Sequence, residues 1–197
     1  MENESAESQA PDQATLELAE YHANILLHSL VPVDIDPETP LRMVKALAEM
    51  TSGYYETPLD ILSKQFVGAN GIVLLRDIRF SSLCEHHILP FTGTATVGYL
   101  PNPNTEKIIG LSKLARVTEA HSKRLQTQER LTRNIAFDVE LALNAKAVGV
   151  IIKGHHQCMG CRGVKQPNAE MITSTMLGAF RSDSDARAEF INLVNQR

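Results

Sequence analysis

Two short segments of the sequence concentrate side chains that bind soft metal ions. Residues 84–87 read Cys-Glu-His-His, and residues 155–163 read His-His-Gln-Cys-Met-Gly-Cys-Arg-Gly. Together they contain all three cysteines and four of the seven histidines of the chain. Thiolate and imidazole groups are typical ligands of zinc, which needs no redox partner. The sequence therefore predicts a zinc site that joins the two segments.

The spacing of the candidate ligands leaves two kinds of zinc site open. Cys84 and His87 are separated by two residues, so one tight turn can present both to the same ion, and Cys158 can complete a set of three. Three protein ligands with a fourth open position are typical of catalytic zinc. Cys161 is separated from Cys158 by two residues and would instead close the site as a structural zinc with four ligands.

Three further histidines lie close to these candidate ligands. His86 and His156 could move protons at neutral pH, which favours a catalytic site over a structural one. Supporting or surface positions are the alternative for both side chains. His155 alternates with His156 along a predicted strand, so we expect it to face away from the site and to be structural.

The composition is that of a soluble globular protein. Hydrophobic residues make up 43% and charged residues 21% of a 21.7 kDa chain, which is enough to form a buried core. A net charge of -4 gives no basic surface, so we expect no nucleic acid partner. No secretory signal and no membrane-spanning apolar run is apparent. Three cysteines make no disulfide framework, and we expect a reducing, cytoplasmic location.

The first third of the sequence predicts an N-terminal helical arm. Residues 1–13 are acidic and rich in serine, so we expect a disordered tail there. Thr39 and Pro40 are suited to the N-cap and the first position of a helix. The arm, assigned to residues 14–69, is expected to contain helices at about 16–30, 39–54 and 58–66.

The remaining residues, 70–197, predict one catalytic domain of the α+β class. β-Branched and apolar runs indicate strands, and Ser112, Thr127 and Ser184 are suited to cap helices. An antiparallel sheet interrupted by a pair of helices is the expected architecture. The predicted strands cover residues 72–80, 92–99, 107–110, 148–152 and 171–180, and the predicted helices cover about 112–124, 127–145 and 184–194.

A series of ordered motifs resembles the GTP cyclohydrolase I family. The resemblance extends from about residue 14 to the C-terminus. It implies zinc-dependent hydrolytic opening of the imidazole ring of GTP, release of C8 as formate, and re-closure to 7,8-dihydroneopterin triphosphate, the first step of folate or tetrahydropterin biosynthesis. The motifs are ETPLRMVKAL (38–47), CEHH (84–87), GYLP (98–101), GLSKLARV (110–117), LQTQERLT (125–132), HQCMGCRGV (156–164) and TSTMLGAFR (173–181).

The resemblance also implies roles for residues around the metal. The residues that match the family's zinc ligands are Cys84, His87 and Cys158. Cys161 would then be a spare thiol near the ion. His86 and His156 match catalytic histidines, the first placed to supply protons and the second to assist near the ribose and the opening ring.

Substrate recognition follows from the same resemblance. Glu129 would accept hydrogen bonds from N1–H and the exocyclic amine of guanine. Its position alone, in the first turn of a helix, would instead favour a carboxylate that only interacts with the helix dipole. Gln128 would support the base or a neighbouring subunit. Cationic and hydroxyl groups would bind the triphosphate and ribose, namely Ser112, Lys113, Arg116 and Arg162, together with Arg42 and Lys45 from another subunit.

The implied architecture is the tunnelling fold, or T-fold. Antiparallel sheets from five subunits would join into a barrel, and two rings would stack into a homodecamer with sites shared between subunits. Two enzyme alternatives are a GTP hydrolase that stops at formate release or the formylamino stage, and a related T-fold pterin enzyme. A third alternative, of another class, is a zinc-stabilised module that binds GTP or a pterin without turnover.

Overall fold

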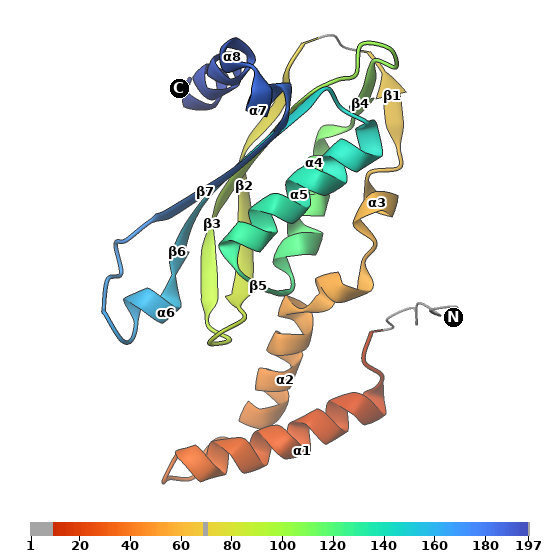
Figure 1. The fold of residues 1–197 in the computed structure, drawn as a ribbon. Helices are drawn as coiled ribbons and strands as arrows, with labels where there is room; N and C mark the ends of the chain where they lie inside the picture. The colour runs from red at the N-terminus through yellow and green to blue at the C-terminus, as the bar shows by residue number, and fades with distance from the viewer. Residues whose placement is uncertain (1–9, 69–70, 197) are drawn as a thin grey trace, which may run out of the picture.

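The computed structural model describes residues 10–68 and 71–196 (Figure 1). The predicted disordered tail falls largely on residues 1–9, which lie outside the described residues, and the predicted boundary between arm and domain falls on residues 69–70, which lie outside them too. The first helix begins at Gln13, where the Asp12 side chain accepts a hydrogen bond from the Thr15 amide and caps the helix.

The N-terminal arm is a pair of helices that extends away from the sheet (Figure 1). Its second helix opens one residue earlier than predicted: Glu38 occupies the N-cap position and Thr39 is already helical, with Pro40 in the first turn. The predicted helix 58–66 is wrong over its second half, because residues 65–67 pair with a distant strand. The elements are α1 (Gln13–Leu30), α2 (Thr39–Met50), a 3-10 turn η1 (Ser52–Tyr55) and α3 (Pro58–Ile61).

A five-stranded sheet forms the body of the protein, in the order β5-β2-β3-β6-β7. Every neighbouring pair is antiparallel except β2 and β5, which are parallel. A separate two-stranded antiparallel sheet joins β1 to β4. The strands are β1 (Gln65–Val67), β2 (Val73–Cys84), β3 (Pro90–Leu100), β4 (Lys107–Ile109), β5 (Leu125–Gln126), β6 (Ala147–His156) and β7 (Met171–Gly178).

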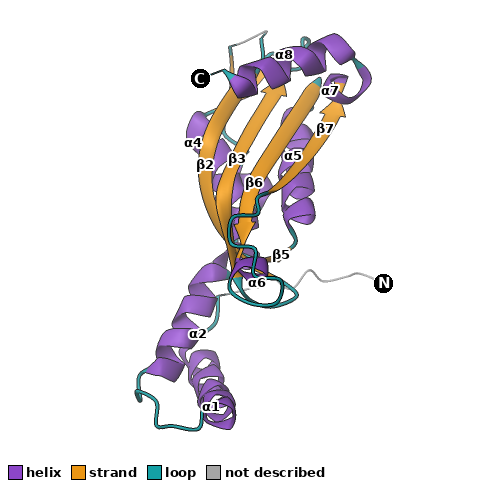
Figure 2. Cartoon of the chain, turned by 90° about the vertical axis from the view of Figure 1, so that its left-hand side faces the viewer, coloured by secondary structure: helices purple, strands orange, loops and turns teal. Residues whose placement is uncertain are grey.

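Helices cover both faces of the large sheet, as Figure 2 shows. One face packs along its length against α4 (Leu111–Ser122) and α5 (Gln128–Leu143), and alternate strand residues meet apolar helix residues there in the main core. The other face meets α7 (Ala179–Ser182) and α8 (Ser184–Asn195) at one end, where Phe180 and Phe190 are fully buried. This arrangement leaves the opposite end of the sheet for the two metal-binding segments.

Helix capping agrees with the sequence at one of four predicted positions, since Thr39, as described above, is already helical. Thr127 caps α5 as predicted, its side chain accepting from the Arg130 amide. Ser112 and Ser184 do not cap their helices, because Ser112 lies two residues and Ser184 one residue after the N-cap position. Gly110 occupies the N-cap position of α4. At the start of α8, the Asp183 carboxylate accepts hydrogen bonds from two backbone amides.

Both outer edges of the large sheet are open within the part of the chain that the structure describes. β5 pairs with β2 only at Leu83 and Cys84, so the rest of that edge of β2 has no strand beside it. β7 likewise has a neighbour only on its β6 side. Open strand edges can pair with another chain. None of the described helices has the length and apolar character needed to cross a membrane.

Candidate metal centre

The Cys-Glu-His-His segment forms the tight turn between β2 and β3. The Cys84 carbonyl accepts hydrogen bonds from the amides of His87 at 3.2 Å and Ile88 at 2.8 Å, and the Cys84 amide donates to the Leu89 carbonyl at 2.9 Å. Ile88 has a φ of 55°, a left-handed conformation that is rare for a β-branched residue. The turn therefore presents the side chains of Cys84 and His87 on one side.

The pairing of β3 with β6 brings the second segment to this turn. Phe91, near the start of β3, lies opposite His156, the last residue of β6. The chain then turns into the short helix α6 (Gln157–Gly160), which carries Cys158. The pairing of the strands thus brings together two segments that are about seventy residues apart in the sequence. The sequence predicted that these two segments meet.

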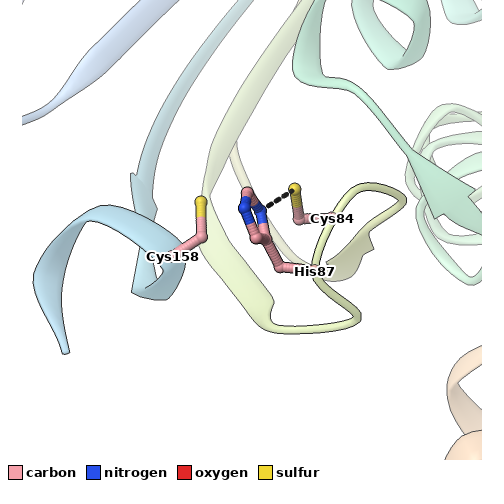
Figure 3. Close-up of side chains that lie close together, drawn as sticks. All are labelled: Cys84, His87 and Cys158. Carbon is pink, nitrogen blue, oxygen red and sulfur yellow. Dashed lines mark hydrogen bonds between the residues drawn. The ribbon is translucent and has the colours of Figure 1, made fainter. Parts of the chain in front are cut away.

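Cys84, His87 and Cys158 form a group that could hold a metal ion (Figure 3). Their ligand atoms all lie within 4.8 Å of one another, and Cys84 Sγ is 3.6 Å from His87 Nδ1. A tetrahedral zinc ion with bonds of about 2.3 Å to sulfur and about 2.0 Å to nitrogen places such ligands about 3.5 Å apart. The donor set and its spacing therefore fit zinc.

The protonation of the thiols depends on the ion. Burial and the neighbouring Cys84 raise the pKa of the Cys158 thiol above its usual range, so the protein alone favours the protonated form. A bound divalent cation reverses this preference, because its charge stabilises thiolate. Cys84 is buried, Cys158 is half-buried and His87 is exposed, so the group lies at the protein surface with one side open.

Cys161 lies outside this group. Its side chain is exposed, and its Sγ donates to the Gln157 carbonyl at 3.0 Å, one turn back along the chain. The structure thus brings together three of the four ligands that a closed structural site would need.

His86 is exposed beside the metal group, with Nδ1 4.0 Å from Cys84 Sγ. Its Nε2 lies 3.7 Å from the carboxylate of Glu85, which forms an ion pair with Arg130. Arg130 also donates to the Gln126 side chain at 2.8 Å and to the Leu125 carbonyl at 2.7 Å. Sequence reasoning missed this support, although Glu85 lies inside the motif and Arg130 directly follows Glu129.

His156 is held on two sides. Its ring stacks on Phe91 with centroids 4.5 Å apart and planes within 3°, and its Nε2 lies 3.0 Å from Gln128 Oε1. Burial lowers the pKa of His156, and the carboxylate of Glu129 partly offsets this effect. His155 is exposed, 3.8 Å from the Glu170 carboxylate, and therefore faces away from His156 as expected.

Glu129 and Gln128 open helix α5 but differ in exposure. Glu129 is exposed and lines a cavity of about 500 Å³ between α5 and the open edge of β7, together with Arg133, Thr173 and Arg181. Gln128 is 1% exposed and makes its side-chain contacts inside the protein. The carboxylate is thus available to a ligand, whereas the amide is not.

Comparison with known proteins agrees with this geometry. The sequence model of the family described as GTP cyclohydrolase I matches residues 32–195. The chain is 48% identical to GTP cyclohydrolase 1 of Coxiella burnetii (strain RSA 493 / Nine Mile phase I) over 81% of this chain and 86% of that protein. It is 43% identical to the Gloeobacter violaceus protein of that name, covering 85% of this chain and 81% of the relative, and 45% identical to the human one, covering 80% and 62%.

The chain belongs to the GTP cyclohydrolase I family. The family resemblance predicted from the motifs is thereby confirmed, and so is the α+β T-fold with its antiparallel sheet. The GTP cyclohydrolase I motifs at residues 84–87 and 156–164 are the segments that meet at the metal group.

Most of the residues that the GTP cyclohydrolase I resemblance assigns to the triphosphate lie apart from the metal group, whereas the charge of Arg162 acts on the Cys158 thiol. Ser112, Lys113 and Arg116 occupy the first turns of α4, which follows β4 at the far end of the sheet, where the Ile109 amide bonds to Tyr99 Oη. Arg162 is exposed in the loop after α6.

Two further predicted phosphate ligands lie on the arm. Arg42 and Lys45 are exposed on α2, and Arg42 pairs with Glu38 and, at 3.8 Å, with Asp36. Figure 2 shows α2 beyond one end of the sheet, and α4 and α5 beside opposite edges. Of the predicted cations, Arg162 therefore lies near the metal group of its own chain, whereas those on α2 and α4 are on separate helices.

Proposed function

We propose that this protein is a GTP cyclohydrolase I, which converts GTP and water to formate and 7,8-dihydroneopterin triphosphate. The observation that carries the proposal is the meeting of Cys84, His87 and Cys158, with His86 and His156 beside them, in a chain that matches the family over residues 32–195. His86 Nδ1 lies 4.0 Å from Cys84 Sγ and His156 lies two residues before Cys158, which supports a role for both in moving protons.

The three ligands are proposed to hold zinc with its fourth position open to solvent. Zinc, when bound, acts as a Lewis acid that activates water for hydrolysis. The exposure of His87 and the position of Cys161 outside the group support an open rather than a closed site. The thiols of the site would stay reduced in the cytoplasm, which is the proposed location.

The histidines are proposed to move the protons of the reaction. His86 is exposed and close to Cys84 Sγ, so it can donate a proton to the guanine ring as C8 is attacked. His156, whose pKa is lowered by burial, can remain neutral near pH 7 and accept or return a proton beside the opening ring. The two side chains thus differ in environment and in proposed role.

Glu129 is proposed to select guanine. Its exposed carboxylate in the cavity beside β7 can accept hydrogen bonds from N1–H and the exocyclic amine, a donor pair that adenine lacks. The paired contacts would orient the base so that its imidazole ring points toward the metal group.

The complete site is proposed to form between subunits. The open edges of β2 and β7 can pair in successive chains, which would close the sheets of five subunits into a barrel, and two such rings would make a decamer. Pairing β7 with the β2 edge of a neighbour would place that neighbour's α4, with Lys113 and Arg116, beside Glu129. Arg42 and Lys45 would reach the triphosphate from a third chain.

Product analysis with GTP tests the proposed function. Metal-replete protein is incubated with GTP, and formate and pterin are measured by mass spectrometry, with chelator-stripped protein as control. One formate for each dihydroneopterin triphosphate, only with metal, is the expected result. Formate without pterin would favour a hydrolase that stops after ring opening. Bound zinc with neither product would favour a binding module.

A further inference from the structure

We infer that Gln128 is a positioning residue that keeps the proton of neutral His156 on Nε2 and thereby leaves Nδ1 as the nitrogen available to substrate. The inference rests on the proposed function only in giving His156 a task in the reaction. It differs from the role that the family resemblance suggested, because a side chain 1% exposed does not touch a bound base.

The orientation of the Gln128 amide follows from the atoms around it. Nε2 lies 3.2 Å from the Ile152 carbonyl and 3.0 Å from the Met171 carbonyl, and carbonyl oxygens only accept hydrogen bonds. The NH₂ group must therefore face these two oxygens, and Oε1 must face His156. The reverse orientation would place three oxygen atoms together without a proton between them.

The hydroxyl groups of two threonines require the same orientation of the Gln128 amide. Thr132 Oγ1 donates to the Gln128 backbone carbonyl at 2.7 Å, so it must accept at its 2.6 Å contact with Thr173 Oγ1. Thr173 Oγ1 then accepts from Gln128 Nε2 at 3.1 Å. This closed circuit of donors and acceptors is consistent with only one orientation of the Gln128 amide.

The close packing of Gly154 keeps the amide in place. A Cβ atom at residue 154 would lie 2.4 Å from Gln128 Oε1, so the amide fills the space that any larger residue would need. The Phe91 ring stacks on His156 and holds the plane of the imidazole. The main motion left to the imidazole is rotation within that plane, and the contact of Nε2 with Gln128 Oε1 restricts it.

The tautomer of His156 follows from these contacts. An amide oxygen accepts but does not donate, so Nε2 must carry hydrogen at a 3.0 Å separation from Oε1. Neutral imidazole has one N–H, and Nδ1 is then left with its lone pair. Loss of the acceptor would allow both tautomers, and only one of them presents the correct nitrogen.

Two substitutions at residue 128 isolate this effect. Gln128→Met and Gln128→Glu both remove the donations to Ile152, Met171 and Thr173, but only the glutamate retains an oxygen that accepts from Nε2. Protein labelled with ¹⁵N-histidine is studied by solid-state NMR, and the His156 signals are assigned by difference from His156→Asn. We expect the Nε2–H form alone in the wild type, protonated Nε2 without the Nδ1–H tautomer in Gln128→Glu (as the Nε2–H form or as imidazolium), and a mixture of neutral tautomers in Gln128→Met.

Gly154→Ala provides an independent perturbation, because it alters neither Gln128 nor His156. The added methyl group should displace the amide and give the same mixture of tautomers. Gln126→Met is the matched control: Gln126 is equally buried at 2% exposed, but it contacts Arg130 and the His121 carbonyl and should leave the His156 tautomer unchanged.

Kinetics separates positioning from substrate contact. Gln128→Met should lower kcat by about 10- to 100-fold, a part of the about 100- to 10,000-fold that acid–base catalysis contributes, with KM for GTP and zinc content unchanged. An unchanged tautomer in Gln128→Met, or a raised KM with unchanged kcat, would overturn the inference. The tautomer measurement needs no turnover, so failure of the proposed function would appear separately, as a wild type that releases no formate.

Discussion

At the metal-binding end of the sheet, Cys84, His156 and Cys158 are placed by backbone hydrogen bonds between β2, β3 and β6 within one chain. On α2 and α4, by contrast, the predicted phosphate ligands are exposed, except for the half-buried Lys113, and they lie on helices outside the metal group. The difference teaches that one chain builds the candidate metal group by itself, whereas the proposed triphosphate site would need further chains to complete it.

Loss of a metal ligand should have the largest effect, because it removes the part that one chain builds. Cys84→Ser and Cys158→Ser should each lose zinc and reduce formate release below detection, since hydroxyl is a poor substitute for thiolate. Zinc content is measured by atomic emission after gel filtration. Full zinc occupancy in either variant would exclude that cysteine from the ligand set.

Removal of His86 should separate chemistry from metal binding. His86→Ala is expected to keep zinc and oligomer size but to lower kcat by about 100- to 10,000-fold, the usual contribution of a general acid. Metal analysis, light scattering and formate assays on the same sample provide the readout. A variant as active as the wild type would remove His86 from the mechanism.

Removal of a predicted phosphate ligand tests the other side of the comparison. Arg116→Ala should raise KM for GTP by about 10- to 100-fold, because one charge-assisted contact is lost while the metal group is intact. Steady-state kinetics at constant ionic strength measures the change. An unchanged KM would mean that Arg116 is only a solvated side chain of α4.

Mixed oligomers sharpen this prediction. Coexpression of Arg116→Ala chains with Glu129→Ala chains should restore native site composition at about a quarter of sites if each site takes these residues from different subunits. The purified mixed oligomer should therefore be more active than either parent oligomer. No recovery would place Glu129 and Arg116 in the site of a single chain.

The smallest effect is expected at Cys161. Cys161→Ser should keep zinc and activity within about twofold, because its Sγ bonds to the Gln157 carbonyl and lies outside the metal group. Metal analysis and formate release are compared with the wild type. Stoichiometric loss of zinc would instead support the closed site with four ligands.

The sequence predicted the metal group well because few contexts other than metal binding concentrate thiols and imidazoles at such spacing. It predicted the strands that carry the group to within a few residues, since β-branched runs are local signals. It failed at residues 65–67, which are a strand only because Lys107–Ile109 pairs with them across a long separation.

The burial of Gln128 could not be foreseen for a related reason. A glutamine beside a glutamate at the start of a helix has the pattern of an exposed residue, and its contacts come from β6 and β7, far along the chain. The predicted caps at Ser112 and Ser184 failed more simply, because a residue two positions or one position earlier is the N-cap and the local pattern does not fix a helix start to within two residues.

The left-handed backbone conformation of Ile88 lowers the free energy of unfolding, and substitutions at this residue would show the effect as a change in melting temperature. A non-glycine residue in this conformation stores about 1–3 kcal/mol, and the side chain is 52% exposed, so little packing offsets it. Ile88→Asn, which suits this conformation, should raise the melting temperature of metal-free protein. A stability screen run without zinc would therefore select residue types that favour the left-handed conformation at this position, and the turn that presents His87 would be retained.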